Sequence, residues 1–191
     1  MRIIFIAILF IPFYSKANVE CSKAFSESET YECMRAVYKQ AHIDLDGLEF
    51  SQQEKRLPSS HPHRYLMYSI VLLNDSQFEK AVFWYYAGKL RYEFYFRAHP
   101  ELKGSGEVTL ASSLKKVLLG VSYDFNKLVF SKKSAKVIDE VLSWDEKVKN
   151  EFTSKIKFKV EWLLARKSME ETKARISQYD NIFDAPDALE K

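Results

Sequence analysis

Residues 83–96 read FWYYAGKLRYEFYF, and eight of these 14 side chains are aromatic. Wound as a helix, at about 100° per residue, the stretch carries a broad apolar stripe. The centre of the stripe is formed by Phe83, Ala87, Leu90 and Phe94. Polar side chains are confined to a narrow wedge of Lys89, Glu93 and Arg97, which are spaced for pairing along the helix. Because so little of its surface is polar, we predict that this helix is the central one of the fold.

Arg91 falls inside the apolar part of this helix, where a guanidinium needs a partner or a path to solvent. Two interpretations are open. A structural arginine would pair with a carboxylate of another helix or stack on an aromatic ring. A functional arginine would bind an anion or a partner at one end of an aromatic cleft. Gly88, close to Arg91 on the helix, predicts the close approach of a neighbouring helix.

Helical periodicity extends over the rest of the chain, which has only five glycines and five prolines. The predicted fold class is therefore all-α, a compact multi-helix bundle. An apolar run at 65–73 fits a buried strand or a short helix, and the capping-box pattern of Ser76 and Glu79 after it favours the helix. The predicted helices cover 28–41, 65–73, 77–98, 108–119, 131–144 and 150–175, and the predicted connections cover 51–63, 104–106 and 121–130.

The two ends of the chain are predicted to lie outside this bundle. Arg2, an apolar run at 3–13 and small residues before a cleavage point after Ala17 form a secretory signal peptide. An apolar run of eleven residues is shorter than the roughly 20 that a membrane-spanning helix needs, which disfavours retention as an anchor. We expect a periplasmic or secreted mature protein with a single helical domain at 18–177. The periodicity is lost at 178–191, which predicts a partly disordered tail.

The mature chain is nearly balanced in charge. Loss of residues 1–17 removes two basic side chains and leaves 27 basic against 26 acidic ones. Nucleic acid and anionic membranes are normally bound by a concentrated basic surface, so the balance argues against both as the main partner. We also expect no stable membrane insertion after cleavage. The stretch 147–159 alternates lysines with apolar residues and predicts an amphipathic helix whose lysines face solvent, with a membrane-surface role as the alternative.

The chain has two cysteines, Cys21 and Cys33, and both follow the signal peptide. In an oxidising compartment they predict one structural disulfide, which would stabilise the fold by about 3 kcal/mol in the chain-entropy model. Lipid modification of Cys21 is disfavoured because the preceding residues are not the small, uncharged ones of a lipoprotein signal. A metal-binding or catalytic thiol is disfavoured because no histidine lies at ligand spacing.

The sequence contains no recognisable enzyme motif. There is no phosphate loop, nucleophile elbow or paired-cysteine zinc spacing. His61 and His63 flank a proline, which favours a surface loop over a metal pair. The acidic residues of 27–32 and 170–171 are interpreted as solvated helix faces, since a glycosidase pair needs a defined separation across a cleft. We therefore predict a protein that is not an enzyme, with no cofactor and no metal.

Two short segments resemble known families. Residues 75–82, DSQFEKAV, followed by Tyr85, Tyr86 and Leu90, resemble the turn and second helix of a tetratricopeptide or Sel1-type unit, over the 24 residues 68–91. No second copy follows at the period of such a repeat. The string FWYYxGKLR is similar to a motif in small exported bacterial helical proteins, some of which resemble immunity proteins against secreted toxins. This second resemblance implies export and protein binding, and assigns no catalytic residue.

These observations together predict an exported protein-binding protein, of the immunity type, that occludes a secreted toxin or enzyme. Aromatic and arginine side chains most often dominate the energy of an interface, which points to Tyr86 and Arg97, with Arg91 as the functional alternative. The loop at 58–64 adds His61 and His63. Two other functions are kept: an envelope scaffold or assembly factor that uses the tetratricopeptide-like hairpin, and a small periplasmic hydrolase whose site forms only in three dimensions.

Overall fold

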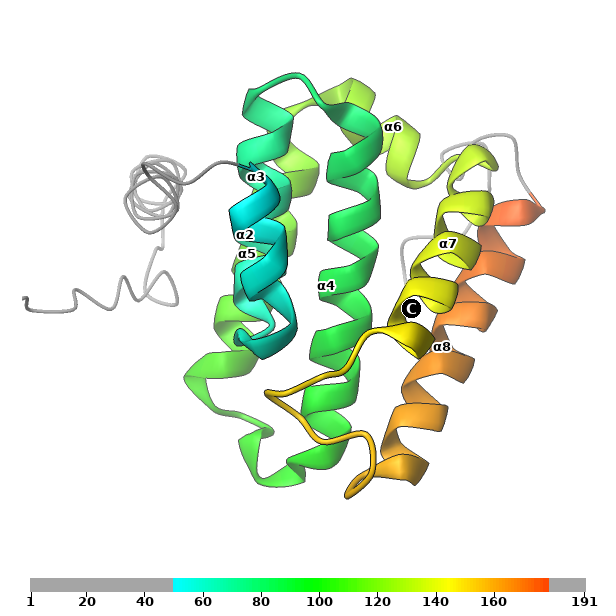
Figure 1. Cartoon of the computed structure of the whole chain (residues 1–191). Helices are drawn as coiled ribbons and strands as arrows, with labels where there is room; N and C mark the ends of the chain where they lie inside the picture. The colour runs from blue at the N-terminus through cyan, green and yellow to red at the C-terminus, as the bar shows by residue number, and fades with distance from the viewer. Residues whose placement is uncertain (1–49, 179–191) are drawn as a thin grey trace, which may run out of the picture.

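The computed structural model describes residues 50–178, and these residues form helices and no extended strand (Figure 1). The prediction of an all-α fold is confirmed. The predicted signal peptide, the helix at 28–41, Cys21, Cys33 and most of the tail lie outside the described residues. The elements follow in the order α2 (Phe50–Arg56), η2 (Leu57–Ser59), α3 (His63–Asn74), α4 (Phe78–Ala98), η3 (Pro100–Leu102), α5 (Gly106–Val121), α6 (Tyr123–Val129), α7 (Lys133–Lys147) and α8 (Lys159–Ser177).

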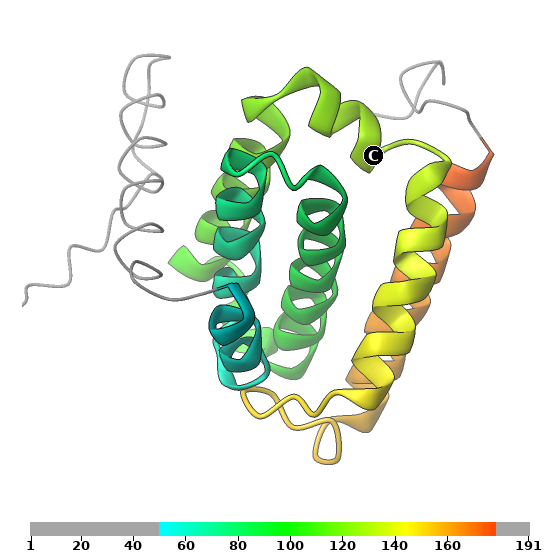
Figure 2. The same ribbon diagram turned by 45° about the horizontal axis from the view of Figure 1, so that its top comes forward.

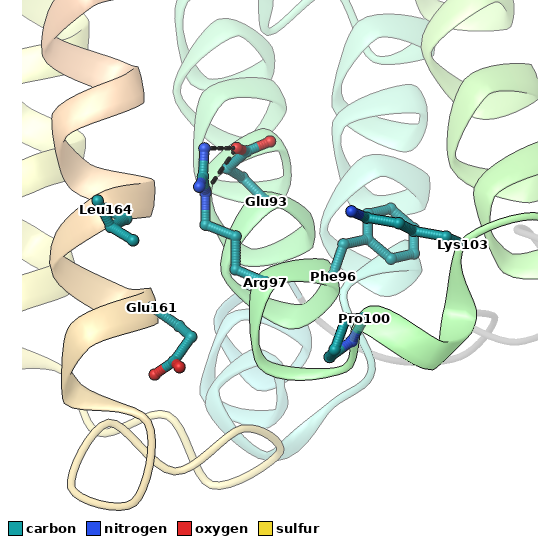
Figure 3. Close-up of a pocket in the computed structure, with 7 residues that line it drawn as sticks. All are labelled: Glu93, Phe96, Arg97, Pro100, Lys103, Glu161 and Leu164. Atoms are coloured by element: carbon teal, nitrogen blue, oxygen red, sulfur yellow. Dashed lines mark hydrogen bonds and ion pairs between the residues drawn. The ribbon is translucent and has the colours of Figure 1, made fainter.

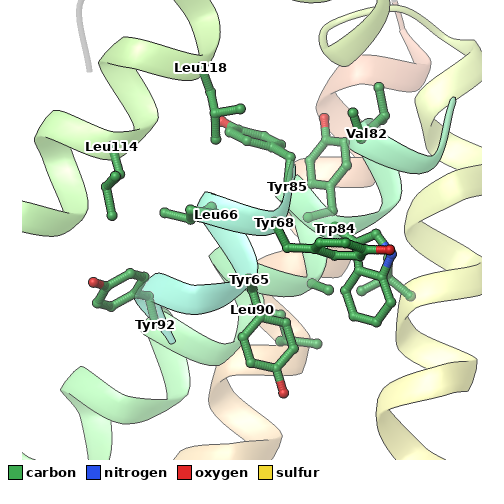
Figure 4. Packing of buried hydrophobic residues seen from close by; sticks show 14 of the residues in the cluster. Tyr65, Leu66, Tyr68, Val82, Trp84, Tyr85, Leu90, Tyr92, Leu114 and Leu118 are labelled. Carbon is green, nitrogen blue, oxygen red and sulfur yellow. The ribbon is translucent and has the colours of Figure 1, made fainter. Parts of the chain in front are cut away.

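Helix α4 is the centre of the bundle, as its sequence predicts. It packs against α3 on one side and against the α7–α8 pair on the other, and it also contacts α6 and η3 (Figure 1). Its aromatic residues interdigitate with the apolar side of α3 and with leucines of α5 (Figure 4). Helix α6 crosses from α5 to α7 over one end of the bundle (Figure 2).

The pairing of α3 with α4 explains the glycine in the middle of α4. A Cβ atom at Gly88 would lie 2.7 Å from Leu66 Cδ2 of α3, so only glycine allows the two helices to approach this closely. Ser69 ties the same two helices together, because its buried hydroxyl donates to the carbonyl of Ala81 at 2.6 Å. The predicted close approach at Gly88 is therefore confirmed, and the run at 65–73 is helical.

Three local predictions are wrong. Ser76 does not cap α4, because its φ of +60° is left-handed whereas an N-cap residue is extended. The expected connection at 121–130 contains α6, which begins after Ser122, whose hydroxyl accepts from the amide of Phe125 at 3.3 Å. The expected loop at 51–63 is largely helical, since α2 and η2 occupy it.

The predicted start of the last helix is also wrong. The helix expected to begin near Asn150 begins at Lys159, and 148–158 form an irregular connection at the end of the bundle opposite α6 (Figure 2). Lys155 turns inward, and its ammonium donates to the carbonyls of Asp145 and Val148. These two carbonyls lie at the C-terminal end of α7. The amphipathic helix with solvent-facing lysines predicted at 147–159 is therefore absent.

Candidate functional site

A groove of about 490 Å³ lies between α4 and α8 near the C-terminal end of α4 (Figure 3). Phe96 and Arg97 of α4 form part of its floor, and Leu164 and Glu161 of α8 form one wall. The other side is formed by η3 and the residue that follows it. The lining residues are Glu93, Phe96, Arg97, Pro100, Lys103, Glu161 and Leu164. The groove thus combines apolar surface with charged side chains of both signs.

Two residues of the polar wedge of α4, Glu93 and Arg97, line this groove. Arg97 holds Glu93 through two nitrogens, with Nη2 and Nε at 2.7 and 2.8 Å from the same carboxylate oxygen (Figure 3). Lys89 lies two turns before Arg97 on the same strip. Its ammonium donates to the hydroxyl of Thr172 on α8 at 3.5 Å. The only carboxylate of the strip is therefore engaged by its own neighbour, whereas Lys89 meets a neutral hydroxyl.

The electrostatics of Lys89 indicate an excess of positive charge at this end of the strip. Burial, together with the nearby charges of Lys115 on α5 and Arg175 on α8, lowers the pKa of Lys89 to about 8, and Glu93 opposes the shift. Burial also lowers the pKa of Lys115, again against the attraction of Glu93. Lys89 therefore feels the charges of two other cations, Lys115 and Arg175, and of Glu93, which Arg97 already engages.

An exposed apolar face adjoins the groove. Four large aliphatic side chains stand in solvent at and just before the N-terminal half of α8: Ile156, Val160, Leu163 and Leu164, at 94, 64, 49 and 43% exposure. We call this set the α8 apolar patch. Leu164 belongs both to the patch and to the groove lining, so the two surfaces are continuous. Single exposed aliphatic residues are ordinary, but a group of four in consecutive turns is typical of an interaction surface.

Arg91 lies in a buried ionic cluster on the other side of α4. Its Nη2 is 3.0 Å from Asp145 Oδ1 of α7, both side chains are 1% exposed, and the guanidinium carbon is 4.9 Å from the centre of the Trp144 ring. Lys155 and Arg166 also pair with Asp145, at 3.5 and 3.3 Å. Arg91 therefore has both structural partners expected for it, a carboxylate from another helix and an aromatic ring. It does not reach the surface where a partner would bind.

His61 and His63 form a hydrogen-bonded pair within an aromatic cluster. Their Nδ1 atoms are 2.7 Å apart, and the amide of His63 also donates to His61 Nδ1. Because His61 Nδ1 accepts, its proton resides on Nε2, which lies 3.2 Å from the carboxylate of Glu107 on α5. His63 therefore donates to His61, whose Nε2 faces the carboxylate of Glu107.

Burial favours the neutral form of both histidines. It lowers the pKa of His63 to about 3, assisted by the charges of His61 and Arg64, and it lowers the pKa of His61 against the attraction of Glu107. The His61 ring contacts three aromatic side chains: Tyr92, Tyr95 and Phe152. Its side chain is 19% exposed. A surface loop is the prediction for these histidines; His61 does lie between η2 and α3, but both histidines are partly buried and His63 begins α3.

The other predicted site residues are divided between core and surface. Tyr86 is 1% exposed and its hydroxyl donates to the carbonyl of Val129 at 2.6 Å, so it is a core residue and the prediction of a surface anchor is wrong. Arg97 is partly exposed and lines the groove, where a partner can reach it. Cys21 and Cys33 lie outside the described residues. Of the predicted contact residues, only Arg97 adjoins the α8 apolar patch.

The α8 apolar patch was missed by reasoning from the sequence. The spacing at 147–159 predicts an amphipathic helix whose lysines face solvent, and in such a helix Ile156 would lie on the side opposite the lysines. The sequence signal for an exposed apolar face is a second set of apolar residues in α8. Ala165, Met169 and Ile176 have helical spacing of their own and are buried, so α8 carries more apolar residues than one buried face uses.

No protein-family model matches this chain, and comparisons with curated proteins and with solved structures found no match either. Between residues 50 and 178, no three histidine, cysteine or carboxylate side chains gather in a metal-binding arrangement. In the same part of the chain, every helix is too short or too polar to cross a lipid bilayer.

Proposed function

We propose that this chain is a protein-binding protein and that its binding surface is the α8 apolar patch together with the adjoining groove. The observation that carries the proposal is the exposure of the four aliphatic side chains of the patch. Protein interfaces combine an apolar centre with a polar rim and are enriched in arginine. Here the patch supplies the centre, and Arg97, Lys103 and Glu161 supply charged side chains beside it.

We further propose that binding serves inhibition, as in an exported immunity-type protein that occludes a secreted toxin or enzyme. An inhibitor that works by occlusion needs a complementary surface and no reacting group of its own. The predicted signal peptide at 1–17 and the balanced charge of the mature chain support this proposal. An envelope scaffold and a small periplasmic hydrolase are the alternative predictions. The antiparallel α3–α4 hairpin supports the scaffold.

The test is capture of the partner by the mature chain, 18–191, and by variants of its surface. A triple variant, Ile156→Ser, Val160→Thr and Leu163→Gln, removes the centre of the patch without touching the buried side of α8. The matched control is Tyr123→Ser, which removes a side chain of 70% exposure on α6. Lysate and medium of the source are passed over each immobilised protein, and the bound proteins are identified by mass spectrometry.

We expect one secreted protein to bind wild type and the Tyr123 control at near-equal stoichiometry and to be lost from the triple variant. Loss of an interface anchor costs about 2 kcal/mol or more, or roughly 30-fold in affinity. Far-UV circular dichroism and the thermal midpoint should stay unchanged in all three proteins. Equal capture by the triple variant would show that the patch is not the binding surface. Absence of any stoichiometric partner would refute protein binding as the function.

A further inference from the structure

The ionic cluster around Asp145 has more cations than carboxylates. Three cations pair with this one carboxylate: Arg91, Lys155 and Arg166. Arg166 also lies 3.7 Å from Glu146, which is largely exposed. Carbonyls near the C-terminal end of α7 accept from all three cations, but a helix end carries only about half a negative charge. The cluster therefore keeps part of one positive charge in excess.

Arg91 also has donors that no described residue accepts. Its Nη2 is engaged, at 3.0 Å from Asp145 Oδ1 and at 3.5 Å from the carbonyl of Val148. Its Nε and Nη1 atoms are buried and have no hydrogen-bond partner within residues 50–178. A guanidinium stays protonated in proteins, so these N–H groups remain donors. Buried donors of a charged group are costly when they are unpaired, which favours an acceptor beside them.

A further buried hydroxyl, that of Tyr65 on α3, lies near Arg91. The centre of the Trp144 ring is 6.1 Å from that of the Tyr65 ring and 4.9 Å from the guanidinium carbon of Arg91. Burial raises the pKa of Tyr65 to about 12, and the charges of Arg91 and Asp145 also act on this pKa. The Tyr65 hydroxyl points away from the leucines of α5 (Figure 4). In the described part of the chain it has no hydrogen-bond partner either.

A small anion suits these groups better than a water molecule does. All of the unpaired groups can donate. A water molecule that accepts from them has two protons of its own to place on acceptors. The carboxylate of Asp145 is already shared by three cations, and it also accepts from the indole of Trp162 at 2.7 Å. An anion has no protons to place, and its hydrogen bonds with a guanidinium are charge-assisted.

We infer that a small monovalent anion, such as chloride, binds inside the bundle at the unpaired donors of Arg91, beside the hydroxyl of Tyr65. The anion compensates the excess charge of the Asp145 cluster and joins α3 to α4. This inference goes beyond the proposed function and does not depend on it, because the α8 apolar patch is a separate, exposed surface. An anion that binds only the folded chain stabilises it by mass action.

The test is the chloride dependence of folding. The mature chain is unfolded with urea in mixtures of sodium chloride and sodium gluconate at constant ionic strength, so that the screening of surface charges stays the same. For a dissociation constant of about 10 mM, an increase from about 1 to about 100 mM chloride should raise the equilibrium constant of folding about tenfold. Crystals grown in sodium bromide locate the ion, because bromide scatters anomalously.

Two variants change the donors, and a third is the control. Arg91→Lys keeps a positive charge beside Asp145 but lacks the guanidinium, and Tyr65→Phe removes only the hydroxyl. The matched control is Tyr92→Phe. Tyr92 is also buried, and its hydroxyl likewise has no hydrogen-bond partner among residues 50–178. Burial and the nearby carboxylate of Glu107 raise the pKa of that hydroxyl, and this carboxylate would repel an anion.

We expect the tenfold effect of chloride in wild type and in Tyr92→Phe, and an effect below about threefold in Tyr65→Phe and Arg91→Lys. A general effect of chloride acts on every variant alike, so the difference between variants reports the site. Bromide should lie at hydrogen-bond distance from Nε or Nη1 of Arg91. If Arg91→Lys does not fold, Tyr65→Phe and the position of bromide decide.

Three results would overturn the inference. The first is equal stability of wild type in chloride and in gluconate. The second is a full chloride effect in a folded Arg91→Lys or Tyr65→Phe protein, which would place the ion elsewhere. The third is a crystal in bromide that shows only water beside Arg91.

Discussion

Acidification from pH 7 to pH 5 should destabilise this protein through its buried histidine pair. Burial lowers the pKa of His63 from 6.5 to about 3 in the folded chain. A group with a lowered folded pKa binds its proton mainly in the unfolded state, so the unfolded chain gains protons first as the pH falls. Stability contributed by neutral His63 is therefore complete above pH 6.5 and is lost progressively down to about pH 3.

The size of the loss follows from the shift. Each pH unit between 6.5 and the folded pKa costs about 1.4 kcal/mol, so the free energy of unfolding should fall by about 2 kcal/mol between pH 7 and pH 5. His61, whose pKa is also lowered, adds to the loss. Protonation of His61 would also place a proton on its Nδ1. This atom accepts a hydrogen bond from His63 in the neutral pair, so that hydrogen bond would be lost. Carboxylates titrate mostly below this window.

Urea unfolding at pH 7, 6 and 5, followed by circular dichroism, measures this loss directly. His63→Gln keeps a donor for His61 Nδ1 but cannot be protonated, so most of the pH dependence should disappear. His99→Gln is the matched control, since it removes a histidine that bonds only the exposed Glu101. A wild-type loss below about 0.5 kcal/mol, or an equal loss in His63→Gln, would refute the assignment of a neutral, packed histidine pair.

Three further predictions concern the core. Asp145→Asn leaves three cations around a neutral amide and should lower the free energy of unfolding by about 3–5 kcal/mol in urea titrations. Tyr86→Phe leaves the carbonyl of Val129 without its donor and should cost about 1–3 kcal/mol, while partner capture stays unchanged because the residue is buried. Gly88→Ala places a methyl group against Leu66 and should cost about 1–3 kcal/mol, measured as a lowered thermal midpoint.

The spacing of apolar residues predicts those helices that depend on neighbouring residues in the sequence. The stripe from Phe83 to Phe94 identified α4 as the central helix, because its polar wedge is too narrow for a surface helix. The partner of Arg91 lies 54 residues away at Asp145, and one sequence offers no means of choosing it among 26 acidic side chains. The need for a carboxylate was therefore predictable from the burial of Arg91, and its identity was not.

The segment at 148–158 shows why the α8 apolar patch escaped prediction. Its spacing of apolar residues is helical, but Lys155 donates to two backbone carbonyls near the end of α7 and holds the chain in an irregular path. Since the helix then begins only at Lys159, Ile156 is not part of its buried face. The side chains that turn inward on α8 begin with Trp162, which donates to Asp145 at 2.7 Å. These tertiary hydrogen bonds of Lys155 accompany the irregular path that leaves Ile156 outside α8.

Two carboxylates organise this protein, and their burial separates their roles. Asp145 and Glu93 each gather cations from neighbouring elements. Asp145 is 1% exposed, and its ion pairs with Arg91 and Arg166 hold α4, α7 and α8 together. Glu93 is 39% exposed and its partner Arg97 is 38% exposed, so this pair is accessible from the groove. Helix α4 supplies Arg91 to the Asp145 cluster and Arg97 to Glu93, and the side of the helix on which each arginine lies decides whether it is buried in the fold or faces the groove.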